Sequence, residues 1–206
     1  IKNLQKIYTG DVLALDDVSF TVEPGEFLAV IGLSGSGKST LLRCINRLIE
    51  PTAGQIIWNG MDITQASQDE MLRIRRKIGM VFQHFNLVSR SKVITNVLAG
   101  RLGYVNPFMS IANRFPQKDI DMALAQLERV GITDQAYKRA DELSGGQQQR
   151  VGIARAMVQE PEMILADEPV ASLDPVLAHS IMSYLEKINQ EDGVMILCSL
   201  HFLDLV

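Results

Sequence analysis

The residues best placed to do chemistry form one glycine-rich segment, Gly32-Leu-Ser-Gly-Ser-Gly-Lys38-Ser39. This segment fits the pattern G-x-x-x-x-G-K-[ST], in which backbone N–H groups of a loop surround phosphate oxygens. The lysine of such a loop contacts the β- and γ-phosphates, and the hydroxyl that follows it binds Mg²⁺. We therefore predict that the chain binds a nucleotide through a phosphate loop made of Gly32, Ser34, Gly35, Ser36, Gly37, Lys38, Ser39 and Thr40.

The segments on either side are those that a phosphate loop needs. Residues 27–31 before it have the length and apolar composition of a buried strand. After it, apolar residues recur at helical spacing and predict an amphipathic helix with Leu41, Ile45, Leu48 and Ile49 on its buried face. A turn between strand and helix directs backbone N–H groups and the helix dipole at one small volume. This context disfavours the alternative of a flexible Gly/Ser turn.

A second candidate element is a pair of adjacent carboxylates, Asp167 and Glu168, which follow the apolar run 163–166. Open α/β sheets bind ligands at the carboxyl ends of their strands, where this pair is expected. Because side chains alternate near a strand end, the two carboxylates should point in different directions. Asp167 suits the oxygen ligands that Mg²⁺ prefers. Glu168 could orient and deprotonate an attacking water.

A third element is the segment Leu143-Ser-Gly-Gly-Gln-Gln-Gln-Arg150. Ser144 and Gln147 have the spacing of a capping box at the start of a helix. Gly145 and Gly146 leave the first N–H groups of that helix open to an anion. Two phosphate-binding helix starts, but one phosphate-loop lysine, indicate that each nucleotide is shared between two copies of the chain.

The remaining pattern predicts strands alternating with helices, which is typical of a parallel α/β core. Asn59-Gly60 predicts a tight turn, and residues 84–116 are irregular and predict a partner-specific surface. A capping box at 67–70 predicts a short helix with a basic run at 73–77, which we interpret as a solvated face that could touch phosphate or anionic lipid. The expected strands are 18–22, 55–58, 78–82, 163–166 and 194–198, and the expected helices include 118–130 and 177–188.

The composition is that of an ordinary globular protein. The chain has 206 residues, 47% hydrophobic and 21% charged, and a net charge of −4, which gives no reason to expect nucleic-acid binding. No apolar run approaches the roughly 20 residues needed to cross a bilayer. Cys44 and Cys198 are expected to be reduced core residues. Because the chain runs from Ile1 to Val206 without an initial methionine, we expect it to be part of something longer.

With these motifs in order, the whole sequence resembles the ATP-binding subunits of ABC transporters. Residues 143–147 match the LSGGQ signature of that family. The resemblance implies further roles: Tyr8 stacks on adenine, Gln83 is the Q-loop glutamine, and His201 is the switch histidine that contacts the γ-phosphate. It also implies that Ser172-Leu173-Asp174-Pro175 form the D-loop. The implied catalytic residues are Glu168, His201, Lys38 and Gln83; the implied metal ligands are Ser39, Gln83 and Asp167; and the implied nucleotide contacts include Ser144, Gly145, Gly146, Gln147 and Asp174.

The same resemblance implies a P-loop NTPase (RecA-like) α/β fold with ATP and Mg²⁺ as cofactors. It implies one domain over 1–206, in which 1–84 and 159–206 form the nucleotide-binding core with an antiparallel β-subdomain. Residues 85–158 would form an inserted helical subdomain with the signature. The implied partners are a second copy in a head-to-tail homodimer, a membrane permease and, indirectly, a periplasmic or lipid-anchored substrate-binding protein. The implied location is the cytoplasmic face of a bacterial membrane.

A finer resemblance, carried by residues 82–88, 96–103, 139–141 and 164–174, is to the ATP-binding subunits of bacterial phosphonate importers. Residues 85–87 also resemble amino-acid and methionine importers, which remain an alternative. A DNA-repair or chromosome-structuring ATPase is a remote alternative, disfavoured by the absence of heptad runs. A non-hydrolysing regulatory module is disfavoured because Lys38, Asp167, Glu168 and His201 are all present. One departure from the family pattern is Phe202-Leu203 after the histidine, where a polar residue is more usual.

Overall fold

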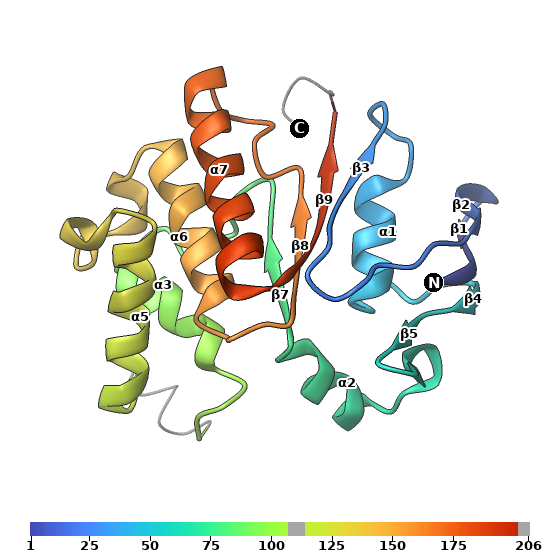
Figure 1. The fold of residues 1–206 in the computed structure, drawn as a ribbon, viewed down its shortest axis with the longest axis horizontal. Helices are drawn as coiled ribbons and strands as arrows, with labels where there is room; N and C mark the ends of the chain where they lie inside the picture. Colours follow the sequence, from blue (N-terminus) through green and yellow to red (C-terminus); the bar gives the residue numbers. More distant parts are fainter. Residues whose placement is uncertain (107–113, 202–206) are drawn as a thin grey trace.

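A parallel sheet forms the centre of the computed structural model, which describes residues 1–106 and 114–201. Its four strands lie in the order β3-β9-β8-β7, and their carboxyl ends share one edge (Figure 1). The sequence interpretation of 202–203 lies outside the described residues. The strands are β3 Phe27–Ile31, β7 Ile78–Val81, β8 Met163–Asp167 and β9 Met195–Leu200.

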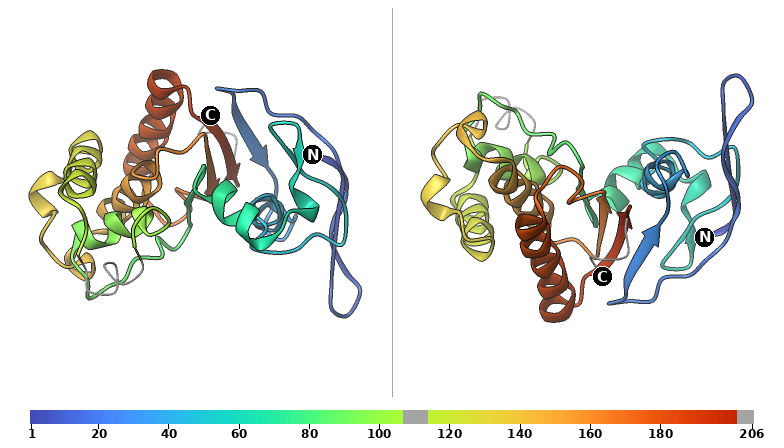
Figure 2. Two further views of the ribbon diagram at one scale, coloured as in Figure 1. Left: turned by 90° about the horizontal axis from the view of Figure 1, so that it is seen from below. Right: turned by 90° about the horizontal axis from the view of Figure 1, so that it is seen from above.

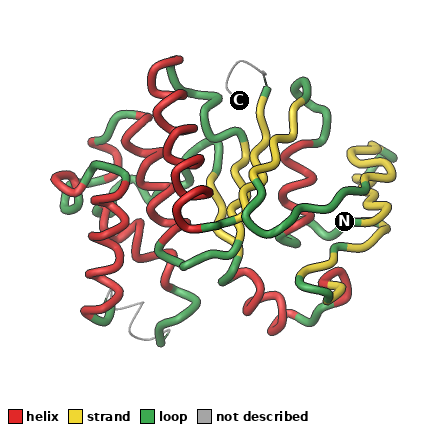
Figure 3. Tube along the Cα trace, viewed as in Figure 1, coloured by secondary structure: helices red, strands yellow, loops and turns green. Residues whose placement is uncertain are grey.

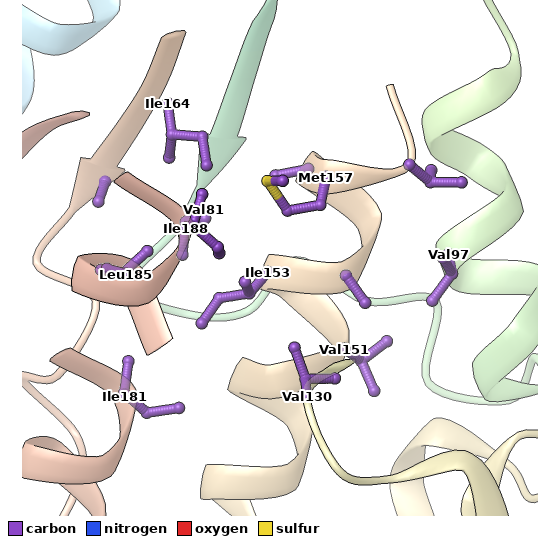
Figure 4. Close-up of a cluster of buried hydrophobic side chains, with 14 of the residues drawn as sticks. Val81, Val97, Val130, Val151, Ile153, Met157, Ile164, Ile181, Leu185 and Ile188 are labelled. Atoms are coloured by element: carbon purple, nitrogen blue, oxygen red, sulfur yellow. The ribbon is translucent and has the colours of Figure 1, made fainter. Parts of the chain in front are cut away.

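Alternating side chains of this sheet enter two separate cores. Ile164 and Ile196 point into a core shared with the helices on one face, shown in Figure 4. Leu165 and Leu197 point into the core on the other face. Both faces of the central strands are therefore apolar, as buried parallel strands require. The helices of the first face are α3 Val93–Leu98, α5 Gln117–Arg129, α6 Gly145–Met157 and α7 Pro175–Asp192 (Figure 3).

The opposite face is covered by α1 (Lys38–Ile45) and by antiparallel strands beyond it (Figure 2). Strands β5 (Ile57–Trp58) and β6 (Met61–Asp62) form a hairpin with a two-residue turn, in which Asn59 and Gly60 have φ of 47° and 81°. This confirms the predicted tight turn, because type I′ turns need positive φ at both positions. The antiparallel strands are β1 Lys2–Tyr8, β2 Val12–Val18, β4 Ala53–Gln55, β5 Ile57–Trp58 and β6 Met61–Asp62.

The fold class agrees with the prediction of a P-loop NTPase core with an antiparallel subdomain and an inserted helical region. Several boundaries also agree. The capping box of Ser67 and Glu70 opens α2 (Gln68–Arg75), and Gly131, with φ of 70°, follows the end of α5. Cys44 and Cys198 are buried free thiols, as expected.

Four local predictions were wrong. The strand expected at 18–22 instead spans 12–18, where residues 12–15 are all apolar and two aspartates follow, so the sequence has no alternation of apolar and polar residues. Leu48 does not lie on a buried helix face, because the helix ends at Ile45 and Arg47 adopts a left-handed φ of 47°. The expected strand 55–58 is two short strands interrupted at Ile56. The irregular region contains the six-residue helix α3.

The basic run after the Ser67 capping box is only partly solvated. The Arg75 guanidinium donates hydrogen bonds to the carbonyl oxygens of Asn46 and Arg47 at 3.0 and 2.6 Å. Arg76 lies over the ring of Tyr104, and Lys77 pairs with Glu162. These basic side chains therefore help to join α2 to its neighbours. Within the described ranges, no helix combines the length and the apolar character needed to span a bilayer.

Candidate functional site

The glycine-rich loop connects β3 to α1, as its sequence context predicts. Gly37 caps α1 with φ of 91°, and a Cβ atom at this position would lie 2.3 Å from the carbonyl oxygen of Ala14. A Cβ at Gly32 would lie 2.7 Å from Oγ of Ser36. Gly35 also has a positive φ, of 81°. The tight curve of the loop therefore depends on residues without side chains.

Lys38 turns back over this loop. Its Nζ donates hydrogen bonds to the carbonyl oxygens of Gly32 at 2.7 Å and Leu33 at 3.1 Å. The same nitrogen lies 3.4 Å from Oε1 of Glu168. Both charged side chains are buried, with 4% and 10% of their surfaces exposed. Buried charges are stable only when they are paired in this way.

Asp167 lies beside the first turn of α1. Its Oδ1 accepts hydrogen bonds from the Ser39 hydroxyl at 2.7 Å and the Ser199 hydroxyl at 3.3 Å. Its Oδ2 lies 3.5 Å from a guanidinium nitrogen of Arg43. The strand alternation explains the placement, because Met163 and Leu165 point into the core on the α1 side and Asp167 continues that face. A hydroxyl and a carboxylate thus converge from residues that are 128 positions apart.

Glu168 faces different partners, as the alternation at the end of the strand predicts. Its Oε2 lies 2.8 Å from Nε2 of His201, and its Oε1 faces Lys38. Its backbone is left-handed, with φ of 50°, which is uncommon for a residue that carries a side chain. The backbone N–H of Glu168 donates a hydrogen bond to the Ser199 hydroxyl at 3.0 Å. The structure therefore brings together Lys38, Glu168 and His201, which the sequence had predicted as site residues.

A cavity of about 280 Å³ opens over the phosphate loop. Its lining includes Tyr8 and Leu13 on the antiparallel strands and Lys38, Ser39 and Glu168 at its base. The hydroxyls of Tyr8 and Thr40 lie 3.2 Å apart. The cavity is thus lined by an aromatic side chain as well as by the glycine-rich loop and its lysine, a combination that suits a ligand with both a ring and phosphate groups.

The chemistry of the donor set also fits Mg²⁺. Ser39 and Asp167 carry hard oxygen atoms of the kind that Mg²⁺ prefers, and these lie in contact with each other at the first turn after the glycine-rich loop. In the described part of the chain, no group of three or more His, Cys, Asp or Glu side chains could hold a metal ion alone. Magnesium commonly keeps waters and binds one or two protein oxygens together with substrate phosphates. These residues therefore suit an ion that arrives with a nucleotide.

Other predicted site residues are not among those that line this cavity. Gln83 lies in a turn two residues beyond the end of β7. Ser144 and Gln147 form the predicted capping box at the N-terminus of α6, with Gly145 and Gly146 in its first turn. Asp174 caps α7 by accepting hydrogen bonds from the N–H groups of Val176 and Leu177. The structure therefore separates the signature segment from the phosphate loop of the same copy.

Two residues near the carboxylates were missed at the sequence level, Ser199 and Arg43. Both contact Asp167. Ser199 is paired in register with Asp167 across β8 and β9. A single serine in an apolar run gives no sign of this pairing, whereas the spacing of Arg43, four residues after Ser39, places it one helical turn along the same face.

Comparison with known proteins agrees with this geometry. The family model described as ABC transporter matches residues 15–171. The chain is 56% identical to the phosphonates import ATP-binding protein PhnC 1 of Halalkalibacterium halodurans, over 100% of the chain and 80% of that protein. It is 53% identical to the phosphonates import ATP-binding protein PhnC of Staphylococcus aureus, over 99% of the chain and 79% of that protein.

Solved structures of the same kind superpose closely. One is the dimeric, post-hydrolysis structure of the ATP-binding cassette MJ0796 bound to ADP and Pi, with a TM-score of 0.86 and 36% identity, over 99% of this chain and 88% of that one. Another is cbiO1 of Clostridium perfringens, part of the transporter complex cbiONQ, with a TM-score of 0.84 and 31% identity, over 100% and 79% of the two chains. The chain therefore belongs to the ATP-binding subunits of the ABC transporter family.

Proposed function

We propose that this chain is the ATP-hydrolysing, energy-coupling subunit of a bacterial phosphonate importer. The single observation that carries the proposal is its 56% identity, over the full chain, with a protein named for phosphonate import. The contacts among the candidate catalytic and metal-binding residues support a role in hydrolysis, since each group is present and paired. These residues are Lys38, Ser39, Asp167, Glu168 and His201.

The proposed roles follow from these contacts. Lys38 leaves the loop carbonyls and Glu168 to bind the β- and γ-phosphates. Ser39 and Asp167 would hold Mg²⁺, with Gln83 as a further ligand, and the ion would supply neutralisation of phosphate charge. Glu168 accepts a proton from the attacking water, and His201 holds Glu168 and contacts the γ-phosphate. Tyr8 stacks on the adenine.

A second copy completes the site in this proposal. The N-termini of α6 and α7 lie on the same side of the molecule as the carboxyl edge of the sheet (Figure 1). Two copies arranged head to tail would then place Ser144–Gln147 of one over the phosphate loop of the other, with Asp174 at the contact. The dimeric structure of MJ0796 with ADP and Pi supports this arrangement. ATP bridging both copies supplies the differential affinity that closes the dimer.

The importer would have three further parts in this proposal. A membrane permease docks on the chain at the cytoplasmic face, and a periplasmic or lipid-anchored binding protein selects the substrate. We propose that the helical segment 85–158 contacts the permease, whereas 1–84 and 159–206 hold the nucleotide. The helical segment packs into the same core as α7 and one face of the sheet, which would let a movement at the nucleotide reach the permease.

The test combines growth and hydrolysis. The gene for this chain, with its permease, replaces the corresponding genes of a bacterium that needs phosphonate import to use a phosphonate as sole phosphorus source. We expect growth with the wild type and the control Glu162→Gln, whose surface pair with Lys77 is remote from the cavity. Glu168→Gln should grow only on inorganic phosphate.

Two outcomes would contradict the proposal in different ways. Equal growth of wild type and Glu168→Gln on the phosphonate, with both proteins at normal levels, would contradict the proposed role of Glu168 in the hydrolysis that drives import. Hydrolysis of ATP without growth on the phosphonate would direct attention to another importer, such as one for methionine or amino acids, and the purified permease would identify it.

A further inference from the structure

Ser199 lies at the carboxyl edge of the sheet and contacts both Asp167 and Glu168, the two carboxylates with proposed roles in hydrolysis. Its side chain is fully buried. The Ser199 Oγ accepts a hydrogen bond from the backbone N–H of Glu168 at 3.0 Å and donates one to Oδ1 of Asp167 at 3.3 Å. The single hydroxyl thus accepts a hydrogen bond from one residue and donates a hydrogen bond to the residue before it in the chain.

The sheet register explains why a hydroxyl reaches both residues. Ser199 pairs with Asp167 on one side and with Val30 of β3 on the other. Paired residues of a parallel sheet point to the same face, so the Ser199 side chain lies beside the Asp167 carboxylate. Its neighbours along β9 on this face, Met195 and Leu197, are apolar. Ser199 is therefore a polar residue in an otherwise apolar row.

The backbone of Glu168 needs such a partner. Glu168 is the first residue after β8, its φ of 50° turns the chain out of the extended conformation, and it is 8% exposed. A buried N–H without an acceptor is costly, and a left-handed backbone persists only where its surroundings hold it. The Ser199 hydroxyl supplies the acceptor and thereby fixes the direction in which the Glu168 side chain leaves the backbone.

Asp167 depends on the same hydroxyl in a different way. Its Oδ1 accepts hydrogen bonds from the hydroxyls of both Ser39 and Ser199. If Ser39 and Asp167 held Mg²⁺, the Ser39 hydroxyl would have to give up this hydrogen bond, whereas the Ser199 hydroxyl, which is not a predicted metal ligand, could keep its own. Groups that orient metal ligands in this manner tune both metal affinity and activity.

We propose that Ser199 is a positioning residue that sets the Mg²⁺ ligand Asp167 and the general base Glu168 through one hydroxyl. The proposal rests on the proposed roles of those two carboxylates. It does not make Ser199 a catalytic residue, because the buried hydroxyl acts through its hydrogen bonds to Glu168 and Asp167. It predicts that loss of the hydroxyl lowers two quantities together, the apparent affinity for Mg²⁺ and the turnover number.

The test compares Ser199→Thr with Ser199→Val, since these side chains have nearly the same shape and differ in the hydroxyl. Ser199→Ala removes the hydroxyl without adding volume, which keeps the test available if the larger residues impair folding. Cys198→Ala is the structural control, because Cys198 is buried next to Ser199 but points into the other core. It should lower stability without changing the Mg²⁺ requirement.

We expect Ser199→Ala and Ser199→Val to lose about 10- to 100-fold in both kcat and apparent Mg²⁺ affinity, the range typical of groups that orient metal ligands. Ser199→Thr should retain most of both. The KM for ATP at saturating Mg²⁺ should change little in all three, because the phosphate loop is intact. Equal kcat and Mg²⁺ dependence in the Thr and Val variants, or in Ala and wild type, would overturn the proposal.

A second measurement needs neither ATP nor Mg²⁺. Hydrogen exchange of the Glu168 amide in the nucleotide-free protein, followed by NMR, should be slow in wild type and Ser199→Thr and faster in Ser199→Ala and Ser199→Val. Exchange that is the same in all four proteins would overturn the placement of the hydroxyl. Because this readout does not involve hydrolysis, it separates a failure of the Ser199 proposal from a failure of the proposed ATPase function.

Discussion

Nζ of Lys38 lies 3.4 Å from Oε1 of Glu168, and the same Glu168 carboxylate places Oε2 2.8 Å from His201. The lysine, the candidate base and the candidate switch histidine thus form one chain of contacts, buried at Lys38 and Glu168 and partly exposed at His201. Phosphate oxygens entering the cavity would compete with Glu168 for the lysine. Nucleotide binding would then free one oxygen of Glu168, which is the change a base needs before it can accept a proton.

Replacing Lys38 with Ala should weaken ATP binding and lower hydrolysis by about 10²-fold or more, as for other donors that stabilise developing charge. Steady-state ATPase assays and binding of a fluorescent ATP analogue would measure this. Lys77→Ala is a matched control, because Lys77 forms an exposed pair with Glu162 at 3.2 Å and should leave both properties unchanged. Near-normal hydrolysis in the Lys38 variant would contradict the phosphate-loop assignment.

Replacing Glu168 with Gln should preserve ATP binding and slow hydrolysis strongly, because the amide cannot accept the proton at a useful rate. Bound ATP should then persist and hold two copies together. Light scattering coupled to gel filtration, at high protein concentration and with Mg²⁺ and ATP, should show a dimer that wild type loses as it hydrolyses ATP. Unchanged turnover would remove Glu168 from the role of base.

The sequence predicted those parts of the site that local patterns encode. The Ser144 and Gln147 capping box and the tight turn at Asn59-Gly60 lie where the spacing placed them, because both depend on residues within four positions of each other. The alternation that separates Asp167 from Glu168 is also local. Each of these features could be inferred without knowing which strands are neighbours.

Features that depend on strand neighbours or exposure could not be inferred. Ser199 acquires its two partners only because β9 lies beside β8 in a particular register, and a lone serine in an apolar run does not encode that. The strand at 12–18 was missed because its apolar residues are consecutive at 12–15 and two of these are exposed, so the sequence has no period of two. Tertiary pairing stabilises such a strand more than its own residues do.

The two thiols should be unreactive in the folded protein. Burial raises the pKa of Cys44 to about 11 and the pKa of Cys198 to about 12, whereas a free thiol titrates near 8.5. At pH 8, labelling by a thiol reagent should therefore be slow in buffer and fast in denaturant. Rapid labelling of the native protein would contradict this burial.

These shifts also predict a pH dependence of stability. Because the folded thiols bind their protons more tightly than the unfolded ones, their contribution is fully present below the unfolded pKa. It is lost as the pH rises from about 9 toward the folded values. Urea unfolding at pH 8 and pH 10 should show a smaller loss of stability in the Cys44→Ala variant than in wild type. An equal loss in both proteins would contradict a role of this thiol.

Arg155 should hold the turn that carries Gln83. From α6, its guanidinium donates hydrogen bonds to the carbonyl oxygens of Phe85 and Asn86 at 2.9 and 2.5 Å. Both acceptor residues have left-handed backbones, with φ of 58° and 49°, which is a strained conformation for residues other than glycine. A planar fork with two N–H groups can satisfy both carbonyls at once, whereas an ammonium offers a single point charge.

Arg155→Ala should therefore destabilise the fold by about 1–3 kcal/mol, because hydrogen bonds from a charged donor contribute roughly this much and the contact to Phe85 is partly buried. Arg155→Lys should be intermediate. Hydrogen exchange should become faster in the turn around Gln83. Arg129→Ala is the matched control, because its pair with Asp192 is partly exposed, and such pairs contribute about 0–1 kcal/mol. If Arg155→Ala and Arg129→Ala had the same unfolding free energy and the same hydrogen exchange in this turn, the Arg155 guanidinium would not be the group that stabilises the turn. If stability and exchange protection were lost only in the Arg155 variants, this side chain on α6 would determine the conformation of the turn that carries Gln83. A displacement of α6 would then be expected to move that turn.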